Sequence, residues 1–306
     1  MTLPSARTVR NELDPDRGAL APGRRLDLDD LPRWSPWPAR LLGLEPFEPG
    51  ARDLAKIEAE YGRDKWQQCL DAYRASGGAL DPIRVRLAMN ARDAATPRAA
   101  VYRGGLCLAT VEELLALHYE ALAEAMAGAI AHSRTVVELG SAFGAILWHL
   151  AKRFPGRRYV GGEYADSAVT LAAGLYAKTP EIAVEKFNFY DPGYAILEAA
   201  EAPVTVFTSQ AIEQLPSAAH VLDVLGRYRD KIAAVVHLEP AYDLYGDTLL
   251  GLMRRRYIEL NDYNRDLIGE LRRRPDIRVV RLEPEVIGWN PFNALALVQW
   301  EFDRGG

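Results

Sequence analysis

Cysteine is scarce in this 306-residue chain, in which only Cys69 and Cys107 occur, far apart and without the short spacing of a zinc site. Two distant cysteines favour neither a disulfide framework nor a thiolate-bound metal. Apolar runs are also short: none approaches a membrane span, and the N-terminus lacks the apolar core of a signal peptide. We therefore expect a soluble, cytoplasmic protein with no membrane partner.

An excess of positive charge is missing as well. The chain has 37 Lys and Arg against 42 Asp and Glu, a formal net charge of −5. Proteins that bind nucleic acid usually carry a basic surface, so we expect no nucleic-acid partner and no RNA or DNA substrate. The composition, with 49% hydrophobic residues, is that of a globular protein. The length fits one large domain or a domain with a substantial addition.

The first 130 residues differ in pattern from the rest. Prolines throughout residues 1–50 predict an extended arm or loop, with Trp34 and Trp37 docked on the body. Apolar residues at helical spacing predict helices over 52–76, 82–91 and 110–131. The last of these begins with Thr110 followed by Glu113, the pattern of a capping box. We predict an arm and helical substrate-covering region over 1–130 and a main domain over 131–306.

From Thr135 onward, predicted strands and helices alternate, which is typical of a parallel α/β sheet flanked by helices. The expected strands cover 135–139, 158–162, 182–187, 203–208, 232–238, 278–283 and 294–302. The expected helices cover 144–154, 166–178, 193–200, 217–229 and 248–274. Because no helix separates the last two strands, they are predicted to form an antiparallel hairpin.

The segment at residues 135–144 (TVVELGSAFG) is a buried strand that leads into a glycine-bearing turn. Gly140 and Gly144 allow backbone to approach a ligand closely, but the third glycine of a dinucleotide fingerprint is missing. Glu138 before the turn would repel a pyrophosphate and suits a cation instead. Glu163 ends the next strand, where an acid can accept hydrogen bonds from ribose hydroxyls. The pattern favours a nucleoside ligand that carries a positive charge.

Two later segments follow the third and fourth predicted strands. Asn188 and Phe189 come after the third strand. Asp191 is an alternative to Asn188 as the polar residue that contacts the ligand there. Ser209 and Gln210 come after the fourth strand, at the sheet edge where open α/β folds bind ligands. The sequence then continues as Ile212-Glu213-Gln214-Leu215, in which Glu213 suits the capping of a short turn.

In this order, the four segments resemble the motifs of class I S-adenosylmethionine-dependent methyltransferases. VVELGSAFG is similar to motif I of that family, with Ser141-Ala142 where another glycine is common, and IEQL is similar to a turn that often carries His in place of Gln214. The resemblance implies an α/β, Rossmann-like sheet of seven strands in the order 3-2-1-4-5-7-6, with the last strand antiparallel and an N-terminal helical lid. It also implies S-adenosyl-L-methionine as the cofactor.

The resemblance further implies which residues contact that cofactor. In addition to the motif residues, an aromatic or basic residue ahead of the first strand commonly closes over the methionine carboxylate, and His118 nearby is an alternative base. The cofactor-binding residues implied are Glu138, Gly140, Ser141, Gly144, Glu163, Asn188, Phe189, Ser209 and Gln210, together with Arg103 and Tyr119.

The predicted catalytic residues are His237 and Glu239, at the carboxyl end of the fifth strand. They share one face of that strand by its two-residue period, and a histidine is a natural general base. The alternative for His237 is a hydrogen-bonded core residue. With Asp243, the pair could also hold a divalent cation, but such a set is a weak metal pattern and we predict no metal.

The substrate-binding residues predicted are Asp243 and three residues that would share a face of the expected helix 248–274, namely Tyr257, Asn261 and Asn264. A solvated helix face is the alternative. The C-terminal half also resembles sugar O-methyltransferases of bacterial polysaccharide and secondary-metabolite clusters.

The sequence therefore predicts O-methylation of a small or medium-sized sugar or natural-product substrate, by in-line displacement with a general base. An N- or carboxyl-methyltransferase acting on a natural product or short peptide is the alternative, and a non-catalytic binding protein of the same fold is a third hypothesis. The sequence leaves the assembly open, with a homodimer as one hypothesis.

Overall fold

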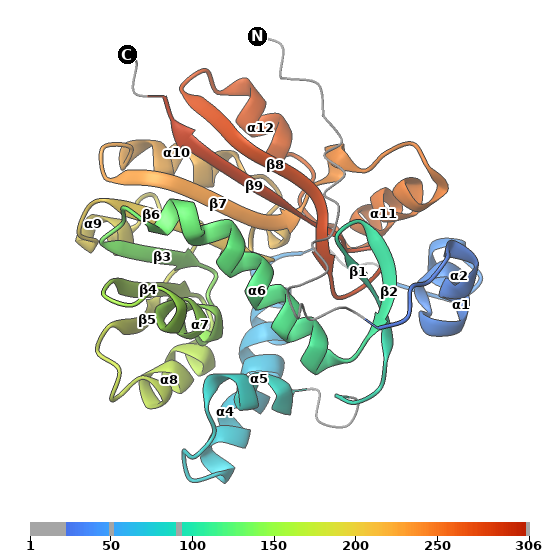
Figure 1. Ribbon diagram of the computed structural model, residues 1–306, viewed down its shortest axis with the longest axis horizontal. Coiled ribbons are helices and arrows are strands. Elements are labelled where there is room, and N and C mark those ends of the chain that lie inside the picture. Colours follow the sequence, from blue (N-terminus) through green and yellow to red (C-terminus); the bar gives the residue numbers. More distant parts are fainter. Residues whose placement is uncertain (1–22, 49–51, 90–93, 304–306) are drawn as a thin grey trace, which may run out of the picture.

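The computed structural model describes residues 23–48, 52–89 and 94–303 (Figure 1). One mixed sheet runs through this part of the chain. Its strands are β1 (Arg98–Tyr102), β2 (Gly105–Ala109), β3 (Thr135–Leu139), β4 (Arg158–Glu163), β5 (Ile182–Lys186), β6 (Val204–Ser209), β7 (Ile232–Pro240), β8 (Ile277–Gly288) and β9 (Leu295–Phe302). Neighbouring strands follow the order β2-β1-β8-β9-β7-β6-β3-β4-β5.

The α/β class and the mixed sheet agree with the expectation, but the number of strands does not. Seven strands were expected, and the sheet has nine because β1 and β2 extend it beside β8. The other seven run in the order β5-β4-β3-β6-β7-β9-β8, in which β3 to β7 are parallel and β9 is antiparallel to both β7 and β8. The first 130 residues are therefore not purely helical.

The β1–β2 hairpin turns at Arg103 and Gly104, whose φ angles are +46° and +78°. Positive φ at both central residues is the geometry that suits the twist of a two-residue hairpin, and glycine at the second position favours it. β1 then pairs with β8 through Val101 and Tyr102. This hairpin anchors the N-terminal part of the chain in the sheet.

Helices cover both faces of the sheet. The longer ones are α4 (Trp66–Ala75), α6 (Val111–Ile130), α7 (Ala145–Arg153), α8 (Asp166–Leu175), α10 (Ala219–Arg227) and α11 (Leu249–Leu260). The shorter ones are α1 (Leu31–Trp34), α2 (Trp37–Leu41), α3 (Leu54–Ile57), α5 (Pro82–Ala88), α9 (Ala195–Ala199) and α12 (Leu267–Arg273). Short non-α turns occur at η1 (Leu28–Asp30), η3 (Ile212–Gln214) and η4 (Tyr242–Leu244), and η2 (Glu58–Lys65) is π-helical.

Alternate residues of the central strands point to opposite faces and build two hydrophobic cores. On one face, Val136 and Val236 pack with apolar residues of α4, α6, α7 and α8. On the other face, Val137 and Val235 pack with α9, α10 and α12. Figure 1 shows α6 crossing the first of these faces. Because β3 is buried at all five positions, it lies at the centre of a three-layer fold.

The helix expected over 248–274 is in fact two helices. α11 ends at Leu260, and Asn261 and Asp262 follow, with Asp262 in the left-handed region at φ +52°. α12 begins only at Leu267, after the side chain of Asn264 has accepted hydrogen bonds from the backbone N–H groups of Asp266 and Leu267. The buried Asn264 thus supports the start of α12, while α11 ends earlier, at Leu260.

The expected N-terminal arm is only partly extended. Residues 1–22 and 49–50 of that prediction lie outside the described residues. Arg25 forms a bridge to Cys107 at the outer edge of β2, and α1 and α2 follow. Trp34 and Trp37 pack against the cluster that contains Leu31 and Tyr257, so both tryptophans dock as predicted.

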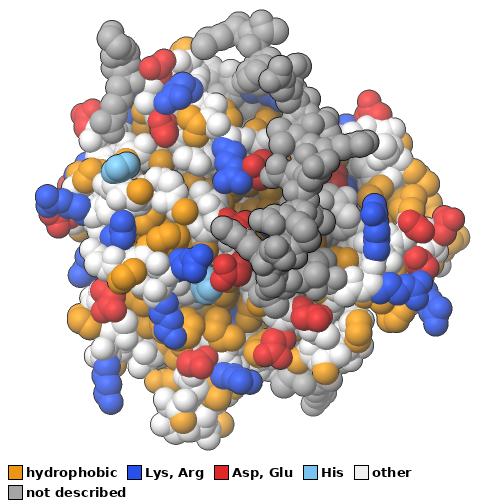
Figure 2. Space-filling model, in the orientation of Figure 1, with side chains coloured by type: hydrophobic (Ala, Val, Ile, Leu, Met, Phe, Trp, Pro, Cys, Tyr) orange, Lys and Arg blue, Asp and Glu red, His pale blue; other side chains and the backbone are white. Residues whose placement is uncertain are grey.

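The described surface mixes charges of both signs. Figure 2 shows Lys and Arg side chains interspersed with Asp and Glu across the face that it presents. Within the described ranges, no helix has the length and apolar character needed to cross a bilayer.

The predicted capping box at Thr110 is present: Thr110 Oγ1 accepts from the backbone N–H of Glu113, and the Glu113 carboxylate accepts from the N–H of Thr110. We expect Thr110→Ala to lower the free energy of unfolding by about 1 kcal/mol, because a first-turn N–H loses its partner. Urea unfolding measures the change. Thr170→Ala, at an exposed position inside α8, is the control and should not destabilise the protein; equal losses in both variants would contradict the role of the cap.

Candidate functional site

A cavity of about 370 Å³ lies at the carboxyl ends of β3, β4 and β6, a volume in the range of small-molecule sites. Its floor comes from the turns that follow these strands. Its cover comes from α3, η2, α4 and α5, together with α6 and the turn between β8 and β9. The lining residues include Leu54, Ile57, Tyr61, Lys65, Trp66, Arg86, His118, Tyr119, Glu138, Gly140, Ser141, Glu163, Asn188, Phe189, Ser209, Gln210, Glu213, Gln214 and Trp289.

The turn after β3 brings backbone to the cavity without side chains in the way. Gly140 has φ +80°, and a Cβ atom there would lie 2.5 Å from the Cβ of Ala211. Any other residue would therefore be strained and would also collide with the turn after β6. Gly144 is the left-handed residue that starts α7, and it does not line the cavity. Of the two predicted glycines, Gly140 shapes the site and Gly144 sets the start of the helix.

Two buried carboxyl groups face this turn. Burial raises the pKa of Glu138 well above its usual value, and the neighbouring Glu163 raises it further. Oε2 of Glu138 has no hydrogen-bond partner among the described residues, although the side chain is only 1% exposed. A buried carboxyl oxygen without a partner is costly, so this position is suited to a ligand that donates a hydrogen bond or carries positive charge.

Unlike Glu138, Glu163 accepts hydrogen bonds from the backbone of the chain itself. Its two oxygens accept from the backbone N–H groups of Ala142 (2.7 Å) and Ala165 (2.8 Å). Burial raises the pKa of Glu163, and these backbone hydrogen bonds lower it in part. Each carboxylate oxygen can accept a second hydrogen bond, so Glu163 is held in place with acceptor capacity left for a ligand.

The opposite wall is made by the η3 turn. Oε1 of Glu213 accepts from Gln214 Nε2 (2.9 Å), and Oε2 accepts from Asn293 Nδ2 (3.1 Å). Glu239 of β7 lies behind this turn and accepts from the backbone N–H groups of Ala211, Ile212 and Glu213 at 2.9 to 3.2 Å. Burial and the charge of Glu239 together raise the pKa of Glu213 to about 8.

Gln214 ties this wall to the cover. Its Oε1 accepts from Arg52 Nε (2.6 Å), and its Nε2 donates to Tyr61 Oη (3.3 Å) as well as to Glu213. Arg52 also pairs with Glu60 at 3.0 Å, which links it to η2. Gln214, at the position where the similar family turn often carries histidine, thus links the floor of the cavity to its cover by hydrogen bonds.

A guanidinium faces the cavity from α5. The Arg86 side chain lies over the rings of Trp66 and Trp289, 5.5 and 5.7 Å from their centroids. No ion pair joins it to a carboxylate in the described part of the chain, and NH1 donates only a weak bond to Met89 Sδ. Arg86 and Glu138 both act on the buried hydroxyl of Tyr119, so the guanidinium and this carboxyl group lie at the same end of the cavity.

His118 of α6 also lines the cavity, and both of its ring nitrogens are engaged. Nδ1 accepts from Trp289 Nε1 (3.2 Å), so Nε2 carries the proton and donates to Ser209 Oγ (3.0 Å). Burial lowers the pKa of His118 to about 3. The imidazole therefore positions Ser209 and Trp289 and is not free to accept a proton.

The structure brings most predicted cofactor residues together. Nine of the eleven line the cavity, namely Glu138, Gly140, Ser141, Glu163, Asn188, Phe189, Ser209, Gln210 and Tyr119. Gly144 and Arg103 do not line it. Asp191, the rival of Asn188, is exposed and does not line it either. Arg103 occupies the β1–β2 turn and pairs with Glu124 on the surface at 3.5 Å, which removes it from the site.

The geometry does not support His237 as the base. The imidazole is fully buried in the sheet and does not line the cavity. Trp300 Nε1 donates to its Nε2 and Nδ1 donates to Thr208 Oγ1, both at 2.9 Å. Burial lowers its pKa to about 3. His237 is thus a hydrogen-bonded core histidine, the alternative that the sequence left open.

Glu239 and Asp243 also lie away from the cavity. Glu239 is occupied by the three backbone N–H groups of the η3 turn, and Asp243 is exposed in η4. Among the described residues, no three His, Cys, Asp or Glu side chains gather as metal ligands. The set His237, Glu239 and Asp243 is therefore not assembled as a site.

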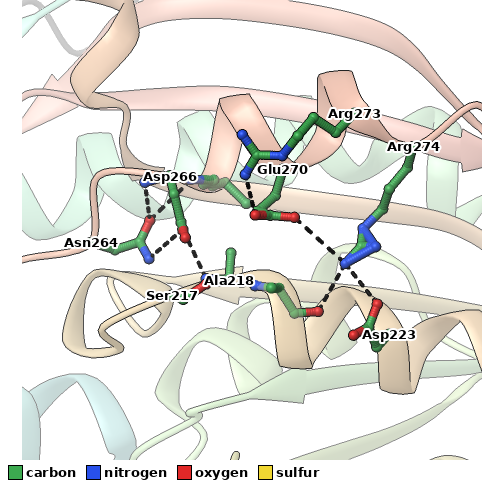
Figure 3. A network of polar contacts seen from close by, with 10 residues as sticks. Ser217, Ala218, Asp223, Asn264, Asp266, Glu270, Arg273 and Arg274 are labelled. Carbon is green, nitrogen blue, oxygen red and sulfur yellow. Dashed lines mark hydrogen bonds and ion pairs between the residues drawn. The ribbon is translucent and has the colours of Figure 1, made fainter.

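The remaining predicted substrate residues have structural positions. Tyr257 is buried against Trp37, with ring centroids 4.5 Å apart, and Asn261 Nδ2 donates to the carbonyl of Tyr257 at the end of α11. Asn264 lies between α11 and α12, where its amide also donates to Leu215 O and to Asp266. Figure 3 shows Asn264 and Asp266 in a network of polar contacts around the start of α12, which also holds Ala218. These side chains stabilise loops and do not face the cavity.

The sequence reasoning missed Arg86, Arg52, Tyr61 and Trp289 as site residues, and it assigned Glu213 and Gln214 no ligand. The spacing of α4 and α5 marked amphipathic helices, but it did not show which polar residue turns inward. No local signal marked Arg86, because β1, β2 and α6 separate its helix from the first cavity-forming strand, β3.

No model of a known family matches this chain. No curated protein matches it either. Among solved structures, it is similar to the pyocyanin biosynthetic protein PhzM, with 14% identity over 86% of this chain and 76% of that one and a TM-score of 0.46. The mitomycin 7-O-methyltransferase MmcR has 14% identity over 61% of this chain, which spans only 54% of that structure, and a TM-score of 0.42.

A third similar structure is the N-methyltransferase NodS from Bradyrhizobium japonicum WM9 in complex with S-adenosyl-L-homocysteine, with 13% identity over 60% of this chain and 85% of that one and a TM-score of 0.42. At these identities and TM-scores, the likeness assigns neither a family nor an activity to this chain. The functional argument therefore rests on the residues of the cavity.

Because burial lowers the pKa of His237, we predict that this residue makes the free energy of unfolding decrease in acid. Between pH 6.5 and about 3, the unfolded state binds a proton that the folded imidazole does not, so stability falls as the pH falls. One such histidine contributes a slope of about 1.4 kcal/mol per pH unit. We expect His237→Gln to reduce the slope of unfolding free energy between pH 4 and 6 by about that amount, measured by urea unfolding.

The matched control is Trp300→Phe, which removes the hydrogen bond to His237 but keeps the titrating imidazole buried. It should lower stability at every pH and retain most of the wild-type slope. A His237→Gln variant with the full slope would show that other groups cause the acid dependence.

Proposed function

We propose that this chain is an S-adenosylmethionine-dependent methyltransferase that binds its cofactor in the cavity. The observation that carries the proposal is Oε2 of Glu138, which is buried beside the close-packed turn at Gly140 and has no hydrogen-bond partner in the part of the chain that the structure describes. A carboxyl in that position suits the ammonium group of a methionine moiety, whereas it would repel the pyrophosphate of a dinucleotide.

The charges around the cavity fit the two ends of this cofactor. Glu138 suits the amino group, and Arg86, which pairs with no carboxylate in the described segments, suits the methionine carboxylate. Arg86 thus takes the role that the sequence suggested for Arg103. Glu163 keeps acceptor capacity for the ribose hydroxyls, and Asn188 and Phe189 flank the adjoining part of the cavity.

When bound, the cofactor supplies a methyl group activated by the positive sulfur. The chain itself holds the two reactants in line and excludes water from them. Tyr61, Trp66 and Leu54 of the cover line the cavity, so a small or medium-sized acceptor would lie between them and the η3 turn. Residues 52–89 form the main part of this covering region in the proposal.

We propose an oxygen nucleophile, as for a sugar or natural-product hydroxyl. Methylation of nitrogen or of a carboxylate is the alternative, because those nucleophiles need little help from a base. A binding protein without catalysis is the third hypothesis. Glu138 Oε2 has no hydrogen-bond partner, and Arg86 has no carboxylate partner, among the described residues; both observations support a ligand site in each case.

We expect the full chain to bind S-adenosylmethionine with release of a proton over the pH range in which the empty Glu138 carboxyl is protonated. Burial raises the pKa of that carboxyl, and a bound ammonium favours its ionised form. Calorimetry in two buffers of different ionisation enthalpy measures the release. Glu138→Gln should bind more weakly and release less of a proton, whereas the exposed Glu112→Gln should match wild type; no binding by the wild-type chain would refute the proposal.

Arg86 and Arg84 provide a matched pair on α5, since Arg86 faces the cavity and Arg84 is exposed. We expect Arg86→Met to weaken the binding of S-adenosylmethionine by roughly 10- to 100-fold, the loss of one charge-assisted contact of about 1.5–3 kcal/mol. Arg84→Met should leave the dissociation constant unchanged. Equal affinities of the two variants would exclude Arg86 from the ligand.

A further inference from the structure

Glu213 is a carboxyl group in the cavity wall that the proposed cofactor contacts leave unused. It lies in the η3 turn, on the side formed with Gln214 and Leu215, away from Glu138 and Glu163 of the other strand ends. The side chain is only 3% exposed, yet it lines the cavity. Tyr61 of the cover also lines the cavity and lies close enough for Glu213 to act electrostatically on its hydroxyl.

Neutral donors hold this carboxylate in one orientation. Gln214 Nε2 donates to Oε1 and Asn293 Nδ2 donates to Oε2. Each oxygen retains a second acceptor position, because a carboxylate can accept about four hydrogen bonds. A fixed carboxylate with free lone pairs inside a cavity can take a proton from a bound hydroxyl.

The charged and titratable groups that face Glu213 come from several elements. Glu239 of β7 lies behind it, and Arg52 approaches from the cover. Tyr61, Tyr245, Tyr257 and Tyr263 complete its surroundings, and none of them carries a formal charge near neutral pH. Burial and Glu239 together raise the pKa of Glu213 to about 8, close to the working range of a general base.

We propose that Glu213 is the general base that deprotonates the acceptor hydroxyl. The inference rests on the proposed function and takes the place of the earlier hypothesis for His237. As the acceptor oxygen forms its bond to the methyl carbon, the bond from that carbon to sulfur breaks and its electron pair stays on sulfur. The hydroxyl proton passes to a carboxylate oxygen of Glu213, so atoms and charge balance.

The variant Glu213→Gln separates this role from folding. It keeps the size of the side chain, and one of its oxygens becomes an amide donor. Asn293 can accommodate the change, because its Oδ1 has no partner among the described residues and a rotated amide would place that oxygen opposite the new donor. We therefore expect a folded variant whose dissociation constant for S-adenosylmethionine stays within threefold of wild type.

Activity is measured with S-adenosylmethionine carrying a tritiated methyl group and a panel of acceptors: phenol, catechol and methyl glycosides as hydroxyl compounds, and aniline and primary alkylamines as nitrogen compounds. For the best hydroxyl acceptor, we expect Glu213→Gln to lower turnover about 100-fold or more at pH 8. The wild-type rate should rise between pH 6 and 9, and the rate of the variant should not. The exposed Glu283→Gln should behave as wild type.

A second readout does not depend on turnover. In the full chain labelled with ¹³C at glutamate carboxyls, the signal that disappears in Glu213→Gln should titrate near pH 8, whereas the signal lost in Glu283→Gln serves as the exposed reference. A Glu213 carboxyl that is already ionised at pH 5 would overturn the inference.

The outcomes distinguish the two levels of the proposal. A wild-type chain that does not bind S-adenosylmethionine would refute the function and the inference together. Binding and hydroxyl methylation that persist in Glu213→Gln with an unchanged pH profile would refute only the role of Glu213. Methylation of nitrogen acceptors alone, independent of pH, would also refute it and would favour the alternative function.

Discussion

The hydrogen bonds from the η3 turn to Glu239 are the constraint on which the geometry of the site depends. One carboxylate accepts three successive backbone N–H groups, of Ala211, Ile212 and Glu213, and so fixes the chain where it leaves β6. Ala211 then packs against Gly140, and Glu213 faces the cavity. Burial raises the pKa of Glu239 to about 7, and the backbone donors offset that rise in part. Glu239, predicted from the sequence to be catalytic, instead holds the turn that carries Glu213.

The parts of the fold that follow from local pattern were predictable. The apolar strands β3 to β7 begin within one residue of their predicted starts, because buried parallel strands give continuous apolar runs. The capping box of α6 was readable because it depends on two residues three apart. Gly140 and Glu138 were also correctly placed at the cavity, since the ends of parallel strands meet at one edge of the sheet.

Contacts between distant segments were not predictable. The sequence places His237 at a strand end, but only the packed sheet shows Trp300 and Thr208 at its two nitrogens. Likewise, Asn264 resembles part of a helical face until the break after α11 reveals it as a cap. The β1–β2 hairpin was missed because its runs are short and its partner, β8, follows some 170 residues later. In each case, a tertiary contact decided between two structural interpretations that were both compatible with the local sequence pattern.

The anchoring of the N-terminal segment has an evolutionary consequence. The backbone N–H of Leu26 donates to Leu106 O, and that of Leu108 donates to Arg24 O, so residues 24–26 pair with the outer edge of β2. The covering helices at 52–89 are thus inserted between two pieces of chain that are both fixed in the body. Such an insertion can change in length and side chains while both of its ends stay in register. The cover of the cavity can then diverge among descendants of this chain, while the strand ends that shape the rest of the cavity remain as they are.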